Sequence, residues 1–380
     1  MNKKIIFRTE ELCSLLSSVS SVVNAKNSMP MLSKILLYTF KKNESTYMTM
    51  LASDGDMWMQ RIAKIEDESD EGVSICVEAK DFTQAMLTLP KTVVTINVEE
   101  NKNVAECTYL NGCYKLPYFS AKEYPSPTKV EKGTKGVTIG VVNLLTALDK
   151  VSYATANDPI NVILNGIHFD FTQEGMFATA TDKRKMAIYK DLSTKFEENT
   201  MFNLPAKPCD ILSKALRGHE TEQISISFDS KVAIFKLQDF TLTARLLEGN
   251  YPNCEAIIPK DYTKCVALDK EGLTDALKRV MLMSNSSELA TVCFNNNACT
   301  VSSEDLDNSK SASEDILCEY NEENFKIGLN GNYITQTLQS IGTEKVKVKF
   351  DSPMRPAVFV EDIDSESYSF TTLLMPMKFL

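Results

Sequence analysis

The chain has 380 residues, a formal net charge of −10 and a sequence pI near 5.0. This length suggests two or three domains, and a hydrophobic content of 43% excludes a largely disordered chain. No stretch approaches the roughly 20 apolar residues of a membrane helix, and the apolar run at the N-terminus is too short for a signal peptide, so we expect a cytoplasmic protein with no membrane partner.

The 10 cysteines include no Cys-x-x-Cys pair. They are expected to be small buried side chains in a reducing compartment, and the sequence predicts no metal site and no cofactor. The acidic balance argues against a protein that coats itself with DNA. It does not exclude a ring that touches DNA only through its hole.

A helical pattern occurs three times along the chain. Leu12, Leu16 and Val19 have the i, i+4, i+7 spacing of one helix face. The same triplet recurs after 132 residues and again after a further 129, with constant offsets. Such an internal repeat indicates three copies of one structural module. The repeated positions are Leu144, Leu148 and Val151, then Leu273, Leu277 and Val280.

A second helix is predicted later in each module, in segments that begin at Ala79, Ala206 and Leu329. Around these helices the sequence alternates between apolar and polar residues, for example from Thr92, from Gln223 and from Lys345. Alternation of this kind is typical of half-buried antiparallel strands. We therefore expect an α+β fold with the helices on one face of antiparallel sheets.

Segments rich in proline, glycine and charge separate the modules. Residues 125–133 are expected to link the first two modules and residues 258–261 the last two, and residues 305–314 are predicted to form a polar loop. The expected domains are residues 1–126, 127–256 and 257–380.

Several short strings, in this order and on a triplicated frame, are similar to those of one family. The chain resembles the bacterial DNA polymerase III beta subunit, the sliding clamp, over essentially its whole length. The strings are Leu164-Asn165-Gly166, Ala180-Thr181-Asp182, the run from Arg245 to Pro259, Asn330 with Tyr333, and Met375-Pro376-Met377.

The resemblance implies a head-to-tail homodimer that closes a ring, with sheets outside and two helices per domain lining the hole. It implies a non-catalytic processivity factor for DNA replication that encircles duplex DNA without reading its sequence. The implied partners are the catalytic subunit of DNA polymerase III, the clamp loader, and other polymerases and repair proteins. These partners bind through short linear motifs, often a Gln with downstream Leu and Phe.

Cations on or near the predicted helices are the candidates for contact with DNA phosphates, although each is also a plausible solvated lysine or arginine. The third module's first helix carries acidic residues that offset its cations. The candidates are Lys26, Lys80, Lys150, Lys207, Lys214, Arg217, Lys278 and Arg279.

By resemblance, a partner-peptide groove lies between domains 2 and 3. Flexible methionines suit a site that accepts several ligands. The expected groove residues are Leu164, Thr181, Arg184, Met186, Pro252, Ile257, Asn330, Tyr333, Met354, Leu373, Leu374, Met375, Pro376 and Met377.

The resemblance also places Tyr114 and Leu116 of one copy against Leu282 and Met283 of the other at the dimer interface. The chain departs from the family's usual pattern at Lys183, Ala256 and Glu288, which puts the selectivity of the groove in doubt and leaves the fold unaffected.

Catalytic interpretations have little support. His168 and His219 have no Ser or Cys nucleophile motif near them and are interpreted as core or surface residues. Asp54 and Asp56 are interpreted as a turn. Two alternatives to the clamp remain at this point: a triplicated scaffold that binds peptides but not DNA, and an enzyme whose site is not visible in the sequence.

Overall fold

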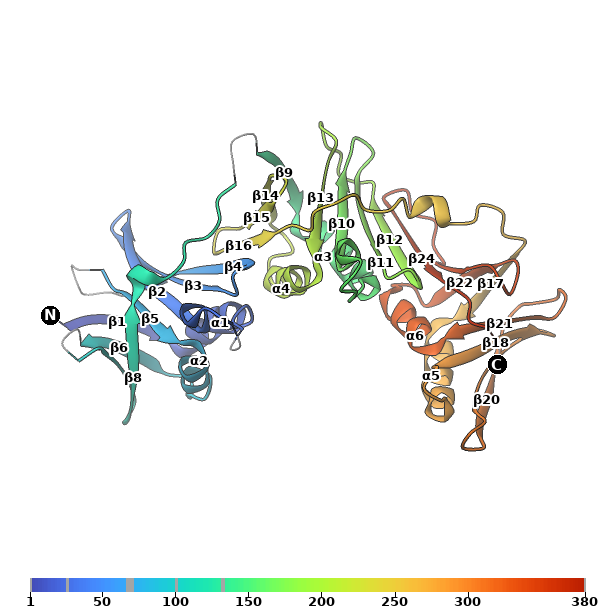
Figure 1. Ribbon diagram of the computed structural model, residues 1–380, viewed down its shortest axis with the longest axis horizontal. Coiled ribbons are helices and arrows are strands. Elements are labelled where there is room, and N and C mark those ends of the chain that lie inside the picture. Colours follow the sequence, from blue (N-terminus) through green and yellow to red (C-terminus); the bar gives the residue numbers. More distant parts are fainter. Residues whose placement is uncertain (1, 25–26, 66–71, 100–101, 131–133, 379–380) are drawn as a thin grey trace. The chain divides into compact units, whose positions relative to one another are not determined.

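The computed structural model describes residues 2–24, 27–65, 72–99, 102–130 and 134–378. Through these residues the chain runs three times through one order of elements: a strand, a helix, four strands, a second helix and three strands (Figure 1). The predicted α+β fold with three repeated modules is confirmed.

The elements of each module have the following bounds. The first module contains β1 (Asn2–Arg8), α1 (Thr9–Ser20), β2 (Lys34–Lys42), β3 (Ser45–Ser53), β4 (Met57–Ile65), β5 (Ser74–Glu78), α2 (Ala79–Leu87), β6 (Val93–Glu99), β7 (Val104–Tyr109) and β8 (Gly112–Ser120). The second contains β9 (Lys135–Gly140), α3 (Val141–Val151), β10 (Gly166–Phe171), β11 (Met176–Thr181), β12 (Lys185–Asp191), β13 (Thr200–Pro205), α4 (Ala206–Leu216), β14 (Gln223–Phe228), β15 (Val232–Lys236) and β16 (Phe240–Arg245). The third contains β17 (Lys264–Asp269), α5 (Lys270–Val280), β18 (Leu289–Asn295), β19 (Ala298–Asp305), β20 (Lys310–Leu317), β21 (Phe325–Asn330), α6 (Gly331–Ser340), β22 (Lys345–Phe350), β23 (Ala357–Glu361) and β24 (Tyr368–Leu374).

The first helix of each module is held in the same way. All nine residues of the predicted apolar faces are at most 2% exposed, as a helix covering a sheet requires. The first residue of each helix also donates its backbone N–H to the carbonyl of the residue just before β6, β14 or β22. These bonds are Thr9 to Thr92, Val141 to Glu222 and Lys270 to Glu344, each 2.9 Å.

The chain divides into two compact units, one of residues 1–141 with 210–246 and one of residues 142–209 with 247–380. The first unit contains a twelve-stranded sheet in the order β1-β6-β7-β8-β5-β2-β3-β4-β16-β15-β14-β9. The second contains an eight-stranded sheet, β13-β10-β11-β12-β24-β23-β22-β17, and a four-stranded sheet, β20-β19-β18-β21. Antiparallel pairing of β4 with β16, and of β12 with β24, therefore carries each large sheet from one module into the next.

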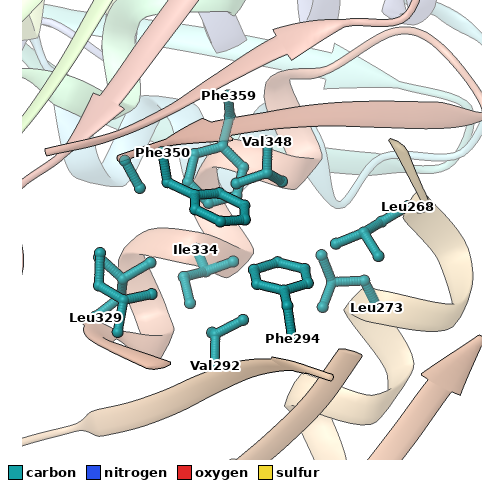
Figure 2. A pocket seen from close by; sticks show the side chains of 11 residues that line it. Leu268, Leu273, Val292, Phe294, Leu329, Ile334, Val348, Phe350 and Phe359 are labelled. Atoms are coloured by element: carbon teal, nitrogen blue, oxygen red, sulfur yellow. The ribbon is translucent and has the colours of Figure 1, made fainter. Parts of the chain in front are cut away.

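The core of the third module is filled by aromatic rings (Figure 2). Phe350 stacks on Phe294 with ring centroids 4.7 Å apart and on Phe325 at 4.3 Å. Figure 2 shows Phe294, Val348 and Phe350 pointing into this core, where a cavity of only about 10 Å³ remains. A fully apolar gap of this size is a packing defect and not a ligand site.

A buried ion pair ties the second module to the third within the second unit. The Lys150 ammonium on α3 contacts the Glu361 carboxylate on β23, with 13% and 4% of the two side chains exposed. Gly342 donates its backbone N–H to the same carboxylate at 2.6 Å. Burial raises the pKa of Glu361, but the hydrogen bonds from Lys150 and Gly342 outweigh burial and hold the pKa below its usual range.

Two expectations from the sequence were wrong in detail. Residues 305–314 do not form a loop, because β19 ends at Asp305 and β20 begins at Lys310. The helix predicted from Leu329 begins two residues later, since β21 extends to Asn330, whose side chain caps α6. The turn interpretation of Asp54 is confirmed, because its carboxylate accepts the backbone N–H groups of Asp56 and Met57 at 3.0 Å each. No helix in the described part of the chain is long and apolar enough to cross a membrane.

Replacing Lys150 with Ala leaves the Glu361 carboxylate buried without its cation, which is expected to lower the free energy of unfolding by about 3–5 kcal/mol. The matched control is Lys91→Ala, which removes an exposed ion pair with Glu10 and should cost less than about 1 kcal/mol. Urea unfolding measures both, and equal losses would contradict a buried pair. Because the folded pKa of Glu361 is lowered, its contribution is present above about pH 4.3 and is lost as pH falls through the folded pKa.

Candidate functional site

Segments from distant parts of the sequence meet at the turn between β11 and β12. Met375, directly after β24, donates its backbone N–H to the carbonyl of Arg184 at 2.8 Å. Met377 donates to the carbonyl of Gly328 on β21 at 2.8 Å. The C-terminal Met-Pro-Met segment is thus bonded to the second module at one residue and to the third at another, as a site shared by the two modules requires.

The turn that receives Met375 is fixed by its own side chains. The Asp182 carboxylate accepts the backbone N–H groups of Arg184 at 2.8 Å and Lys185 at 2.7 Å. The Thr181 hydroxyl donates to the carbonyl of Lys185 at 2.8 Å. Lys183 adopts a φ of +73°, a left-handed conformation that glycine adopts without strain. The departure at Lys183 therefore falls on a position where a residue with a side chain is strained.

The wall of the site that carries Pro252 and Ile257 is anchored by Tyr251. The Tyr251 hydroxyl accepts the backbone N–H of Thr181 at 3.1 Å, and its ring stacks on His168 with centroids 5.1 Å apart. His168 Nδ1 lies 2.8 Å from Asn203 Oδ1. His168 was interpreted from the sequence as a core or surface residue, and its stacking on Tyr251 was not predicted. The alternation of residues along β10 indicates which face His168 lies on but not which ring it contacts.

Beneath the turn lies a buried cation that the sequence analysis also missed. Lys185 is 7% exposed, and its ammonium donates to Gln336 Oε1 at 2.8 Å and lies 4.4 Å from the centroid of the Tyr333 ring. Burial lowers the pKa of Lys185, and the Asp182 carboxylate, 3.8 Å away, acts in the opposite direction. The signal that was available is alternation: Met186 faces one side of β12, so Lys185 must face the other.

The predicted groove residues divide into a buried and an accessible group. Leu164, Thr181, Met186, Leu373 and Leu374 are each at most 8% exposed, so they support the site and present little surface to a ligand. The accessible residues are the exposed Arg184, Pro252, Ile257, Met354 and Met375 and the partly buried Asn330, Tyr333, Pro376 and Met377.

Asn330 links the site to Glu288. Its side-chain amide donates to a Glu288 carboxylate oxygen at 3.1 Å, while its carbonyl oxygen accepts the backbone N–H of Tyr333 at 3.0 Å. The departure at Glu288 therefore places a carboxylate beside the N-terminal end of α6.

The candidate DNA-facing cations are not equivalent in the structure. Lys26 lies outside the described residues. Lys80, Lys207, Lys214 and Arg217 are exposed. The remaining three already contact carboxylates, Lys150 with Glu361, Lys278 with Asp275 at 3.0 Å and Arg279 with Glu314 at 2.8 Å. Lys150 is also largely buried, so we leave it out of the proposed DNA-facing set.

The residues expected at a dimer interface lie on or near strand edges. Tyr114 and Leu116 are half-buried on β8, and Leu282 is 75% exposed. Met283 ends the short 3-10 helix η6 (Met281–Met283) that follows α5. No group of three or more metal-ligating side chains occurs among the residues that the structure describes.

Three tandem α+β modules with shared sheets define a class of ring-forming DNA-clamp proteins, and comparisons with known proteins identify the family. Models of the N-terminal, central and C-terminal domains of the DNA polymerase III beta subunit match residues 3–128, 138–253 and 255–378. The chain belongs to this family. It is a DNA sliding clamp and a non-catalytic processivity factor.

Individual relatives are distant but similar in length. The beta sliding clamp of Synechococcus elongatus is 26% identical, with 93% of this chain and 94% of that protein covered. That of Pseudomonas aeruginosa is 25% identical, with 97% and 98% covered. Among solved structures, a P. aeruginosa sliding clamp bound to griselimycin has a TM-score of 0.89 at 22% identity, with both chains fully covered. A Bacillus subtilis sliding clamp has a TM-score of 0.88 at 20% identity, also with both chains covered.

Replacing Lys183 with Gly relieves the left-handed strain in the turn and is expected to raise the free energy of unfolding by about 0.5–1 kcal/mol. The control is Lys195→Gly, at an exposed position without a positive φ, where glycine should not stabilise. Thermal or urea unfolding of both variants measures the difference. A loss of stability in Lys183→Gly would show that the lysine side chain has a compensating contact.

Proposed function

We propose that two copies of this chain close head-to-tail into a ring around duplex DNA and capture partner proteins at the surface around Met375. The proposed domains are residues 1–126, 127–256 and 257–380. The observation that carries the proposal is the bond between Met375 and Arg184, because it brings the C-terminal segment and the β11–β12 turn into one surface. Because the proposed partners belong to the replication machinery, we expect the protein to act in the cytoplasm.

The chemistry of this surface suits an extended peptide. Met354, Met375 and Ile257 are 70%, 40% and 53% exposed, so apolar side chains are available without unfolding. Methionine is flexible and polarizable and adapts to differently shaped partners. Because the Asn330 amide already bonds Glu288 and the backbone of Tyr333, its second N–H and the polar edge of Tyr333 are the groups proposed to orient a peptide backbone.

The partners we propose are the polymerase III catalytic subunit, the clamp loader, other polymerases and repair proteins, bound through short linear motifs. Support comes from the matched family and from the accessible apolar residues beside fixed backbone polar groups. A related sliding clamp, that of P. aeruginosa, has been solved with the ligand griselimycin bound.

DNA is expected to contact the exposed cations through phosphates alone; these are Lys80, Lys207, Lys214, Arg217, Lys278 and Arg279. Such contacts carry no sequence information and allow sliding. With a net charge of −10, the rest of the surface repels DNA, so that retention depends on closure of the ring more than on attraction.

Replacing Met375 with Glu places a charge among the apolar side chains of the proposed groove. Affinity for a fluorescein-labelled peptide with a Gln and downstream Leu and Phe is expected to fall at least about tenfold, since burying an unpaired charge costs more than 1.4 kcal/mol. Fluorescence anisotropy measures this.

The matched control is Met201→Glu, which charges a methionine that is 66% exposed on β13 and belongs to no proposed site. Peptide affinity that is unchanged in Met375→Glu, or reduced equally in both variants, would exclude the groove assignment. Deletion of residues 375–380 should likewise abolish peptide binding and leave the dimer intact.

The combined variant Lys80→Ala, Lys214→Ala removes two proposed phosphate contacts. The slope of log affinity against log salt concentration for linear duplex DNA should become shallower by about 0.9 for each phosphate contact that is lost. The control Lys236→Ala removes an exposed lysine on β15 that alternates with the buried Phe235 and should leave the slope unchanged. Light scattering on all variants checks that the mass stays twice 42.5 kDa. An unchanged slope in the double variant would contradict contact at these helices.

A further inference from the structure

The linker that forms one wall of the proposed groove is held by side chains and not by a strand ladder. Residues 247–263, all of which the structure describes, form no strand, and their one helical turn is η5 (Glu255–Ile257). This segment carries Pro252 and Ile257, two of the proposed groove residues. The shape of the wall therefore depends on the few polar contacts that fix the linker to the second module.

Asn203 on β13 holds both the linker and His168. Its side-chain nitrogen donates to the carbonyl of Gly249 at 3.2 Å and to that of Leu247 at 3.5 Å. Because carbonyls only accept, these contacts fix which way the amide points and leave Oδ1 for His168, 2.8 Å from Nδ1. The amide oxygen accepts, so Nδ1 carries a proton in either charge state of the imidazole. Nε2 is therefore the ring nitrogen that gains or loses a proton.

His168 in turn supports Tyr251. The two rings stack with centroids 5.1 Å apart and planes 9° from parallel. The Tyr251 hydroxyl accepts the backbone N–H of Thr181 at 3.1 Å, and Pro252 follows Tyr251 directly. A continuous series of contacts thus runs from β13 through the two rings to the turn between β11 and β12.

The charges around His168 favour a cation at this position. Asp170 lies two residues further along the same face of β10; burial raises the pKa of its carboxyl, and His168 acts to lower that pKa, so the two groups interact. Lys190 and Glu255 are paired with each other. An imidazolium would be attracted by Asp170 and would lie against the π face of Tyr251. The titratable groups on this face of the sheet and on residues 247–258 of the linker are Asp170, Lys190, Glu248, Tyr251, Cys254 and Glu255.

We propose that His168 is a positioning residue for the partner-peptide groove, and that protonation of its Nε2 tightens peptide binding by holding Tyr251 and the linker in place. This inference rests on the proposed groove and adds to it a residue outside the predicted groove set. Binding requires the wall to be in place, so a firmer hold raises the fraction of binding-competent molecules. Histidine is the side chain that ordinarily changes charge between pH 5 and 8, so affinity should rise as the pH falls across this range.

Fluorescence anisotropy at about pH 6 and about pH 8 tests the proposal, with an acetylated, histidine-free peptide that contains Gln and downstream Leu and Phe. The unmodified protein is expected to bind about two- to fivefold more tightly at the lower pH, the effect of one cation–π contact at a partly exposed site. In His168→Gln, which keeps a polar side chain but does not titrate, this difference should disappear through a loss of affinity at the lower pH.

The matched control is His219→Gln, because the chain has only 2 histidines and His219 lies beside Glu222 in the first compact unit. This variant should keep the pH difference. Urea unfolding of each variant at both pH values checks the fold, since a purely structural loss would not remove a pH dependence of peptide affinity. If His168→Gln does not fold, His168→Phe, which keeps a ring against Tyr251, replaces it with the same expectation.

Equal affinity of the unmodified protein at the two pH values would overturn the proposal. A pH difference that persists in His168→Gln, or one that is lost in His219→Gln, would overturn it as well. Absence of peptide binding by the unmodified protein at both pH values would instead refute the groove on which the inference rests.

Discussion

The pairing of β12 with β24 is the interaction on which the rest of the second unit depends. It runs from Lys185 opposite Leu374 to Asp191 opposite Tyr368 and makes one sheet from strands of two modules. Because side chains alternate along strands, one face of this pairing meets the helices and the other meets the linker. On the linker face, Met186 and Leu373 pack with Cys254, Ile188 and Val358. On the helix face, Lys185 reaches Gln336 of α6. Directly after the last residue pair of the ladder, Met375 bonds to Arg184, so the proposed partner-binding surface follows from how the two modules are joined.

The helices and the repeat were predictable from sequence because burial on one helix face imposes a period that few other structures share. Leu12, Leu144 and Leu273 are all buried at equivalent positions, as their constant spacing indicated. Strand β20 was not predictable in the same way. On an edge strand, both faces tolerate polar residues, so the run from Lys310 to Leu317 lacks the apolar alternation that marks other strands and resembles a loop.

The candidate site was predictable where residues are accessible and was misjudged where polar groups are buried. Tyr333 and Asn330 are bonded to each other at the start of α6, and Met375 is bonded to the β11–β12 turn, but their assignment to one groove stays a prediction. The two lysines were assigned poorly, since sequence alone gives a lysine no partner. Lys150 was expected to face DNA but contacts Glu361, and Lys185 was overlooked although it lies beneath the Tyr333 ring. Buried lysines are rare, and only the three-dimensional neighbours that satisfy them reveal where they occur.

The strands that join two modules differ in their side chains from β20, which has a free edge in the described chain. At the joints within the chain, the paired residues are largely apolar, such as Met59 opposite Leu242 and Met186 opposite Leu373, and burial makes these joints permanent. The free edge of β20 instead presents Ser311, Ser313 and Asp315 on its outer face. Polar edge residues discourage indiscriminate strand pairing, which would otherwise turn a repeated, self-complementary fold into an open polymer. The joined and free strand edges thus differ in their side chains, while the order of strands along the chain is the same in each module.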